Sequence, residues 1–203
     1  MNILDELGRR ILFFDGGLGS LLQERGLEPG ELPETWNLTR PEILIDIHKA
    51  YINAGADIIN ANTFGANRFK FDNLEEIITA GIANAKKAVA ETGKKAYVAL
   101  DIGSCGKLLK PMGTLDFADA VDVFAEIVRI GDKAGADLIL IETMSDTYEL
   151  KAAVLAAKEN SDLPVFATVI FDESHKMLTG ATPAAVVALL EGLNVDAIGM
   201  NCG

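Results

Sequence analysis

Residues 134–142 read AGADLILIE, in which a small Ala-Gly pair suited to ending a helix precedes an apolar run that closes on a carboxylate. The same arrangement occurs twice more: residues 54–57 repeat the letters AGAD, and residues 193–196 (LNVD) stand before another apolar run. At each place a helix ends and a strand follows directly, at spacings that are multiples of about one helix–strand unit. The chain is therefore predicted to consist of repeated βα units.

Six short segments rich in apolar residues are predicted to be strands. Their apolar character is continuous rather than alternating, which is typical of strands that are buried on both faces of a parallel sheet. The segments are residues 11–15, 57–62, 97–101, 138–142, 165–171 and 197–202.

Helix signals lie between the strands. Five residue pairs have the pattern of an N-terminal cap, in which a short polar side chain precedes an acidic residue or a proline of the first turn. The pairs are Thr39 with Glu42, Asn73 with Glu76, Asp116 with Asp119, Asp146 with Glu149, and Thr182 with Pro183. Glycines at the far ends of these segments are predicted to stop the helices, because glycine readily adopts the left-handed conformation.

Polar residues stand at the C-terminal ends of the predicted strands. They are Asp15, Asn60, Asn62, Asp101, Glu142, Asp172, Asn201 and Cys202. Alternating strands and helices form either a doubly wound sheet or a (β/α)₈ barrel. In a TIM barrel all of these strand ends meet at one mouth, where the active site lies, so the pattern favours the barrel.

Counting the strands predicts an incomplete barrel. A complete one has eight strands and about 250 residues, whereas the chain has 203 residues and six predicted strands. We therefore expect a single α/β domain over residues 1–203, a TIM barrel truncated after strand six to about six βα units. Such an arc leaves two open edges, and a homo-oligomer is one way to cover them.

The composition excludes several classes of function. The formal net charge is −12, which disfavours binding to nucleic acid or to anionic lipid. No apolar run reaches the roughly eighteen residues that a membrane span needs. The two cysteines, Cys105 and Cys202, form no CxxC pair, so a cytoplasmic protein without a disulfide framework is expected.

Residues 15–20, DGGLGS, follow the first predicted strand and form a candidate ligand loop. Its glycines allow a close approach of backbone amides to a carboxylate or a phosphate. The loop is not a dinucleotide fingerprint, since Leu22 stands where the third glycine belongs. A tight βα turn without a ligand remains the alternative.

Glu142 ends an apolar strand, and a carboxylate there needs a cation or a hydrogen-bond donor. With Asp15 it could clamp the ammonium group of an amino acid, and a structural ion pair is the alternative. Taken alone, Cys202 is more often a small buried residue than a metal ligand or a nucleophile. One thiol does not make a zinc site, which needs four ligands. Neither the role of Cys105 nor a catalytic role for either histidine follows from the sequence.

Seven sequence blocks, in order from Ile11 to the last residue, carry a resemblance to a known family. They are DGGLGS (15–20), ETWNLTRPE (34–42), NANTFGANRFKF (60–71), LDIGSCGKLLKPMGTLDF (100–117), IETMSDTYELKAAVLAA (141–157), VFATVIFDESHKMLTG (165–180) and GMNCG (199–203). The chain resembles the homocysteine S-methyltransferase domain, and most closely the N-terminal module of bacterial cobalamin-dependent methionine synthases.

The resemblance implies a (β/α)₈ barrel that binds homocysteine at its mouth and methylates it to methionine. It implies zinc held by three cysteines, of which Cys202 in the GxNC motif is the first; the other two form an adjacent pair that this chain lacks. It also assigns the amino group of homocysteine to Asp15 and Glu142, its carboxylate to the amides of Gly16 and Gly17, and places Asn62 and Thr63 at the mouth. Zinc would deprotonate the homocysteine thiol, which is otherwise a poor nucleophile.

Gly65 bears on the methyl donor. Relatives that use betaine have an aromatic residue at this place, which suits a methylammonium group, so the resemblance implies methylcobalamin, carried with a folate-binding domain on the same full-length protein. This chain alone is then expected to be inactive. Three alternatives stay open: S-methylmethionine as donor, a non-catalytic amino-acid-binding barrel, and an enzyme that binds a phosphorylated substrate at the glycine loop.

Overall fold

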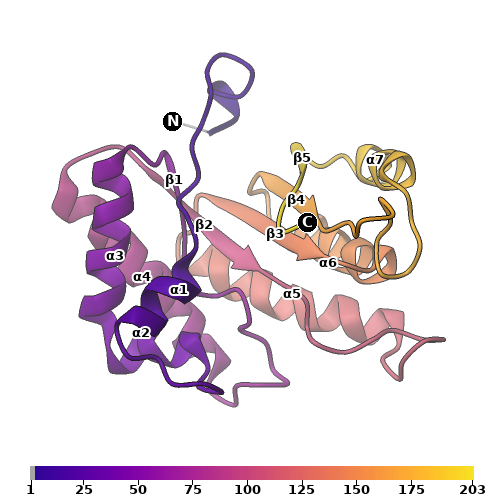
Figure 1. The fold of residues 1–203 in the computed structure, drawn as a ribbon, viewed down its shortest axis with the longest axis horizontal. Coiled ribbons are helices and arrows are strands. Elements are labelled where there is room, and N and C mark those ends of the chain that lie inside the picture. Colours follow the sequence, from indigo (N-terminus) through magenta and orange to yellow (C-terminus); the bar gives the residue numbers. More distant parts are fainter. Residues whose placement is uncertain (1–2) are drawn as a thin grey trace.

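The computed structural model of the protein describes residues 3–203, which form one curved parallel sheet with helices on its outer face (Figure 1). The strand order is β1-β2-β3-β4-β5, and every neighbouring pair is parallel. The strands are β1 (Ile58–Asn60), β2 (Tyr97–Ile102), β3 (Leu138–Met144), β4 (Val165–Val169) and β5 (Ala197–Met200). Because each strand lies beside its predecessor and the order never reverses, the sheet progresses as in a TIM barrel, and the predicted fold class is confirmed.

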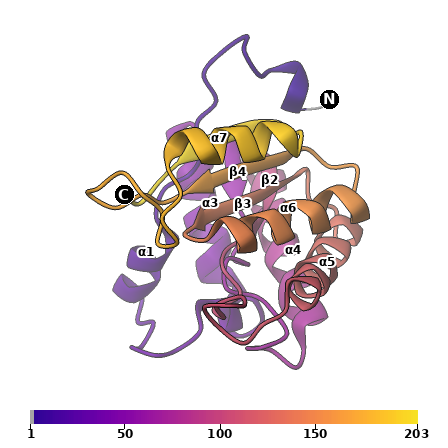
Figure 2. The same ribbon diagram turned by 90° about the vertical axis from the view of Figure 1, so that its right-hand side faces the viewer.

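Helices precede each strand and cover one face of the sheet, as the view in Figure 2 shows for α4, α5 and α6. Helix α3 packs against α4, and α5 against α6. The α-helices are α1 (Leu18–Glu24), α2 (Trp36–Thr39), α3 (Pro41–Ala54), α4 (Leu74–Thr92), α5 (Phe117–Lys133), α6 (Thr147–Asn160) and α7 (Pro183–Gly192), with 3₁₀ turns at η1 (Ile3–Asp5) and η2 (Pro33–Thr35). None of the described helices is long and apolar enough to cross a membrane.

The segment 11–15 lies parallel to β1 but makes only an isolated bridge, between Phe14 and Ile58. The Ile58 amide donates to the Phe13 carbonyl and the Asp15 amide donates to the Ile58 carbonyl. The next bond of a regular ladder would join the Asn60 amide to the carbonyl of Asp15; instead the Asp15 side chain accepts it, at 3.0 Å. The prediction of a full strand at 11–15 is therefore wrong, because a side chain replaces the backbone at the last rung.

Two of the five predicted caps are confirmed as side-chain caps. Asp146 accepts the Tyr148 amide at the start of α6, and Thr182 accepts the Ala185 amide at the start of α7. The predicted caps at Thr39, Asn73 and Asp116 are wrong, since no side-chain bond caps these helix starts. Gly55 and Gly93 end α3 and α4 in the left-handed conformation, as predicted.

The interior of the curved sheet has its own apolar cluster, separate from the layer between sheet and helices. It consists of Ile3, Ile58, Tyr97, Ala99, Leu138, Leu140 and Phe166, all buried. Side chains alternate between the two faces of a strand. This alternation puts the next inward positions, Asn60, Asp101, Glu142 and Thr168, at the C-terminal ends of β1 to β4. The apolar interior thus gives way to polar side chains at one end of the sheet.

Candidate functional site at the C-terminal strand ends

A cavity of about 630 Å³ lies at these strand ends, and segments from every strand contribute to it. Six of the seven predicted site residues line it: Asp15, Gly16, Gly17, Asn62, Glu142 and Cys202. The structure therefore brings together residues that are up to 187 positions apart in the sequence, from Asp15 to Cys202 (202 − 15).

Asp15 is an acid of the cavity whose two side-chain oxygens differ in their surroundings. Its Oδ2 accepts the Asn60 amide, whereas its Oδ1 is buried and has no partner among the described residues. Burial has the largest influence on its pKa and raises it to about 7, against the Asn60 hydrogen bond and together with the charge of Glu142. A cationic ligand would restore the ionised form.

Asp101 is a second buried acid in the same lining, and sequence reasoning did not assign it a role beyond its strand-end position. It is 6% exposed, and its Oδ1 has no partner among the described residues. Burial raises its pKa well above the usual value, and the charges of Glu142, Asp15 and Glu34 add to this effect. Burial also raises the pKa of Glu142.

Four carboxyl groups line the cavity, those of Asp15, Glu34, Asp101 and Glu142, and none of the lysines or arginines within residues 3–203 does. Such a cavity favours a ligand that carries a positive charge, and it disfavours a phosphate.

The glycine turn is fixed by Tyr51 on α3, which sequence reasoning missed. The Tyr51 hydroxyl donates to the Gly17 carbonyl at 3.1 Å. A Cβ at position 16 would lie 2.9 Å from the Tyr51 hydroxyl oxygen, so only glycine fits beneath this ring. In the sequence Tyr51 is one of several apolar positions of a helix, and nothing local distinguishes it.

Asn62 and Thr63 behave differently, although they are adjacent. Asn62 lines the cavity, and its Nδ2 donates to the Pro33 carbonyl (2.9 Å) and to Asn37 Oδ1 (3.0 Å). Thr63 does not line the cavity: its hydroxyl donates to the Asp101 carbonyl at 2.8 Å and accepts the Asp101 amide at 3.1 Å. Thr63 therefore positions Asp101 from behind.

A strained bulge follows Glu142. Thr143 has φ 59°, an unfavourable conformation for a β-branched residue, and the register of β3 against β4 shifts at this point. Asn201 holds the bulge: its Nδ2 donates to Thr143 Oγ1 (2.8 Å), and its Oδ1 accepts from Thr168 (3.0 Å). Strain of this kind is concentrated at functional sites, where it aims side chains.

Cys202 lies at the end of this network. It is exposed, has φ 57°, and its Sγ is 3.6 Å from Asn201 Nδ2. Within residues 3–203 no group of three histidines, cysteines or acids is placed to hold a metal ion. The described residues thus offer a single thiol at the mouth and do not complete a zinc site.

Cys105 is buried in the loop after β2, outside the cavity lining. It is 2% exposed, and its amide donates to Glu149 Oε1 at 2.7 Å, which also accepts from the Ser104 hydroxyl. Burial and the nearby Glu149 charge raise the pKa of the thiol to about 12, so it stays protonated and unreactive. Glu149, which is predicted to complete the cap of α6, instead accepts hydrogen bonds from the loop after β2.

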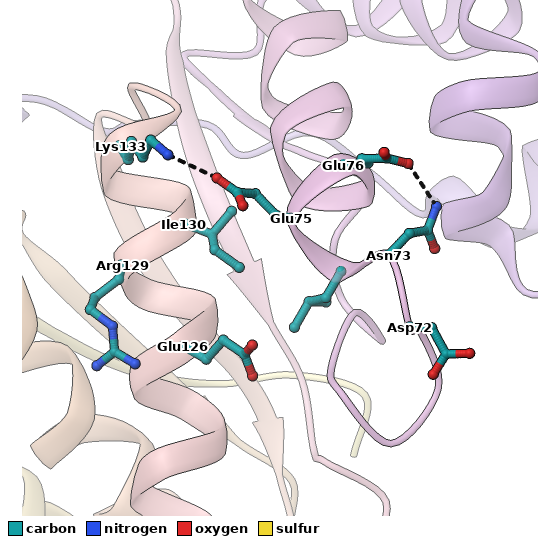
Figure 3. Close-up of a pocket in the computed structure, with 9 residues that line it drawn as sticks. Asp72, Asn73, Glu75, Glu76, Glu126, Arg129, Ile130 and Lys133 are labelled. Carbon is teal, nitrogen blue, oxygen red and sulfur yellow. Dashed lines mark hydrogen bonds and ion pairs between the residues drawn. The ribbon is translucent and has the colours of Figure 1, made fainter.

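A second cavity, of about 670 Å³, lies on the outer side of the sheet between α4 and α5 (Figure 3). Charged side chains dominate it, and Lys133 pairs with Glu75 at 2.8 Å across it. It contains none of the predicted site residues.

Comparison with known proteins gives the family of the chain. The sequence model of the homocysteine S-methyltransferase family matches residues 12–203. Methionine synthases from Mycobacterium tuberculosis and Mycobacterium leprae are 35% and 33% identical over 99% of this chain. The chain spans 18% of the length of each of these relatives.

Solved structures show the same fold. The homocysteine methyltransferase MmuM from Escherichia coli superposes with TM-scores of 0.79 in its apo form and 0.82 in its metallated form. The sequence identities are 24% and 22%, and the matches cover 99% and 98% of this chain and 76% of that protein. Since the family's sequence model extends over nearly the whole chain and the fold agrees, the chain belongs to the homocysteine S-methyltransferase family.

Proposed function

We propose that this chain binds homocysteine at the C-terminal mouth of the sheet and presents its thiol for methylation, which yields methionine. The observation that carries the proposal is the shared cavity, in which the acids Asp15 and Glu142, the glycine turn and the Cys202 thiol face one space. Membership of the family and the methionine synthase relatives support it.

Different residues bind the two charged ends of the substrate. Asp15 and Glu142 bind the ammonium group, for which the acidic cavity is suited. The amides of the Gly16–Gly17 turn bind the carboxylate, and the Tyr51 hydroxyl bond keeps that turn in place. With both ends of the amino acid held, the side chain extends toward Cys202, so its sulfur lies at the mouth.

We further propose that Cys202 contributes one thiolate to a zinc site whose remaining ligands lie outside the described residues. The GMNCG motif, the position of Cys202 at the cavity and the metallated form of the structural neighbour support this assignment. Bound zinc would supply Lewis-acid activation of the substrate thiol. The chain's own residues account only for binding and orienting the substrate.

Methylcobalamin on another domain is the methyl donor that the proposal favours, in a full-length protein that also has a folate-binding domain. The relatives are about five times longer than this chain, which leaves room for such domains. A Cβ at Gly65 would lie 2.7 Å from Glu34 Oε1, which itself accepts the Gly65 amide. An aromatic cage for a quaternary ammonium donor therefore does not fit here. S-methylmethionine remains the alternative donor.

Zinc stoichiometry tests the assignment in the full-length protein. We expect Cys202→Ala to reduce bound zinc from about one ion per chain to near zero and to abolish methyl transfer. Cys105→Ala is the matched control, since this buried thiol lies away from the cavity, and it should retain zinc. Unchanged zinc content in Cys202→Ala would refute the metal assignment.

A non-catalytic amino-acid-binding barrel is the second candidate. The acids at the mouth favour it, because within residues 3–203 they are not accompanied by a complete set of metal ligands. Binding of L-homocysteine without bound zinc and without methyl transfer in the full-length protein would support it.

A further inference from the structure

Three residues that line the same cavity each have a buried side-chain oxygen atom without a hydrogen-bond partner among the described residues. The three atoms are Asp15 Oδ1, Asn60 Oδ1 and Asp101 Oδ1. Only six buried side-chain atoms are unpartnered among residues 3–203, so half of them are gathered at this place. Buried acceptors without a donor are costly, and their concentration in a cavity points to a ligand that supplies the donors.

The backbone explains why these three residues lie at one end of the sheet. Asn60 and Asp101 occupy the last inward-facing positions of β1 and β2, which are neighbouring parallel strands. The Asp15 carboxylate is bonded to the Asn60 amide, so it lies against the same strand end. Thr63 holds Asp101 from behind through two backbone bonds. The three oxygens thus come from adjacent, well-anchored segments.

The chemistry of the group selects its ligand. All three atoms can act as acceptors, no lysine or arginine lines the cavity, and the described acids do not form a group that could hold a metal ion. A primary ammonium group carries three N–H donors and one positive charge. It matches the number of unpartnered oxygens and the sign of the charge that the cavity favours.

We infer that Asn60 and Asp101 complete, with Asp15, an ammonium socket in which each of the three oxygens accepts one N–H of the ligand's amino group, while Glu142 contributes its negative charge to the same site. Asn60 and Asp101 are then specificity-determining residues, which make the mouth select an amino acid over the same molecule without its amino group. The inference rests on the proposed function, in which only Asp15 and Glu142 bind the amino group of the substrate. It extends that function by adding Asn60 and Asp101.

Binding to this socket should release a proton. Asp101 faces Glu142, Asp15 and Glu34, and burial among these acids raises the pKa of Asp101 and of Asp15. In the empty cavity protons therefore reduce the negative charge. When an ammonium group enters, its positive charge balances the carboxylates in place of a bound proton, and that proton passes to the solvent.

Calorimetric titration with two ligands tests the socket. L-methionine is the proposed product, and 4-(methylthio)butanoate is the same molecule without the amino group; neither has a thiol, so metal content does not decide their binding. We expect Asp101→Asn and Asn60→Leu each to weaken L-methionine binding roughly tenfold to a hundredfold, the range for a hydrogen bond to a charged group. The affinity for 4-(methylthio)butanoate should stay unchanged or increase.

Two further readouts separate recognition from a structural role. Titrations in buffers with different ionisation enthalpies should show that L-methionine releases fewer protons from Asp101→Asn than from the wild type. The Tm of Asp101→Asn at pH 8 should rise by roughly 2 °C or more, since the variant no longer buries a carboxyl group whose raised pKa costs stability above its ordinary range. Asp172→Asn, in the loop after β4 and outside the cavity lining, is the matched control and should leave both affinities unchanged.

The outcomes distinguish this inference from the proposed function. If the wild type prefers L-methionine and this preference survives both substitutions, the socket is wrong and the proposed function stands. Equal losses for both ligands, or a lower Tm for Asp101→Asn, would show a structural role and also overturn the socket. If the wild type binds both ligands equally, the proposed function and the socket fail together.

Discussion

His48 lies in the middle of α3, 1% exposed, and neither of its ring nitrogens has a hydrogen-bond partner among the described residues. Burial lowers its pKa to about 4, from an ordinary value of 6.5. Because the protonated form is disfavoured in the folded state, this residue contributes stability above pH 6.5 that is lost as the pH falls toward 4.

We predict that His48→Leu removes this part of the acid sensitivity. A pKa difference of about 2.5 units corresponds to about 3 kcal/mol in the free energy of unfolding between pH 7 and pH 4. Urea unfolding of the wild type and the variant at both pH values measures it. His175→Gln, in an exposed turn, is the control; the same fall in stability from pH 7 to pH 4 in His48→Leu as in the wild type would contradict the prediction.

For individual residues, the sequence identified the acids of the mouth but not their protonation states or hydrogen-bond partners. Asp15 and Glu142 are visible as polar residues at strand ends, and their roles follow from the family resemblance. The importance of Asp101 and Asn60 depends on which atoms find a donor, and that depends on neighbours from other strands. Tyr51 is undetectable locally because its contact with Gly16 joins a helix to a distant turn.

The starts of α5 and α6 show how well a local sequence pattern predicts a helix cap. Both helices have an aspartate at the N-cap position, and the sequence predicts a side-chain cap at each. Asp146 makes the bond to the Tyr148 amide at 2.9 Å. Asp116 instead pairs with Lys110 on the surface, at 2.9 Å. The same residue type therefore stabilises one helix start and not the other.

We expect Asp146→Ala to lower the free energy of unfolding by about 1 kcal/mol, the usual cost of a lost cap. Asp116→Ala is the matched control and should cost less, because exposed ion pairs contribute little. Chemical unfolding of the two variants at pH 7 measures the difference. Equal losses would mean that the bond to the Tyr148 amide does not stabilise α6.

The sheet as a whole has two exposed edges. Segment 11–15 lies at one edge, where Ile11 and Phe13 are 75% and 60% exposed, and β5 lies at the other, where Met200 is 77% exposed. Apolar side chains next to unpaired strand groups favour association between chains.

We therefore predict that the 203-residue chain self-associates through these edges in a concentration-dependent manner. The double variant Ile11→Lys/Phe13→Lys should weaken the association, since it places charges on one edge. Leu178→Lys, which changes a similarly exposed residue in the loop between β4 and α7, is the control. Sedimentation velocity over a range of concentrations measures the effect; a monomer at every concentration would exclude it.

The sequence by itself determined the order of strands and helices, the helix ends at Gly55 and Gly93, the family, and the polar residues at the mouth apart from Asp172, which lies outside the cavity lining. These features follow from local patterns, namely apolar runs, glycines that tolerate left-handed angles, and motifs that are contiguous in the chain. Tertiary structure decided whether 11–15 is a strand, which aspartates cap, and which oxygens remain without donors. Each of these depends on competition for one hydrogen bond between groups that are distant in sequence, as when the Asp15 side chain takes the Asn60 amide in place of its own carbonyl.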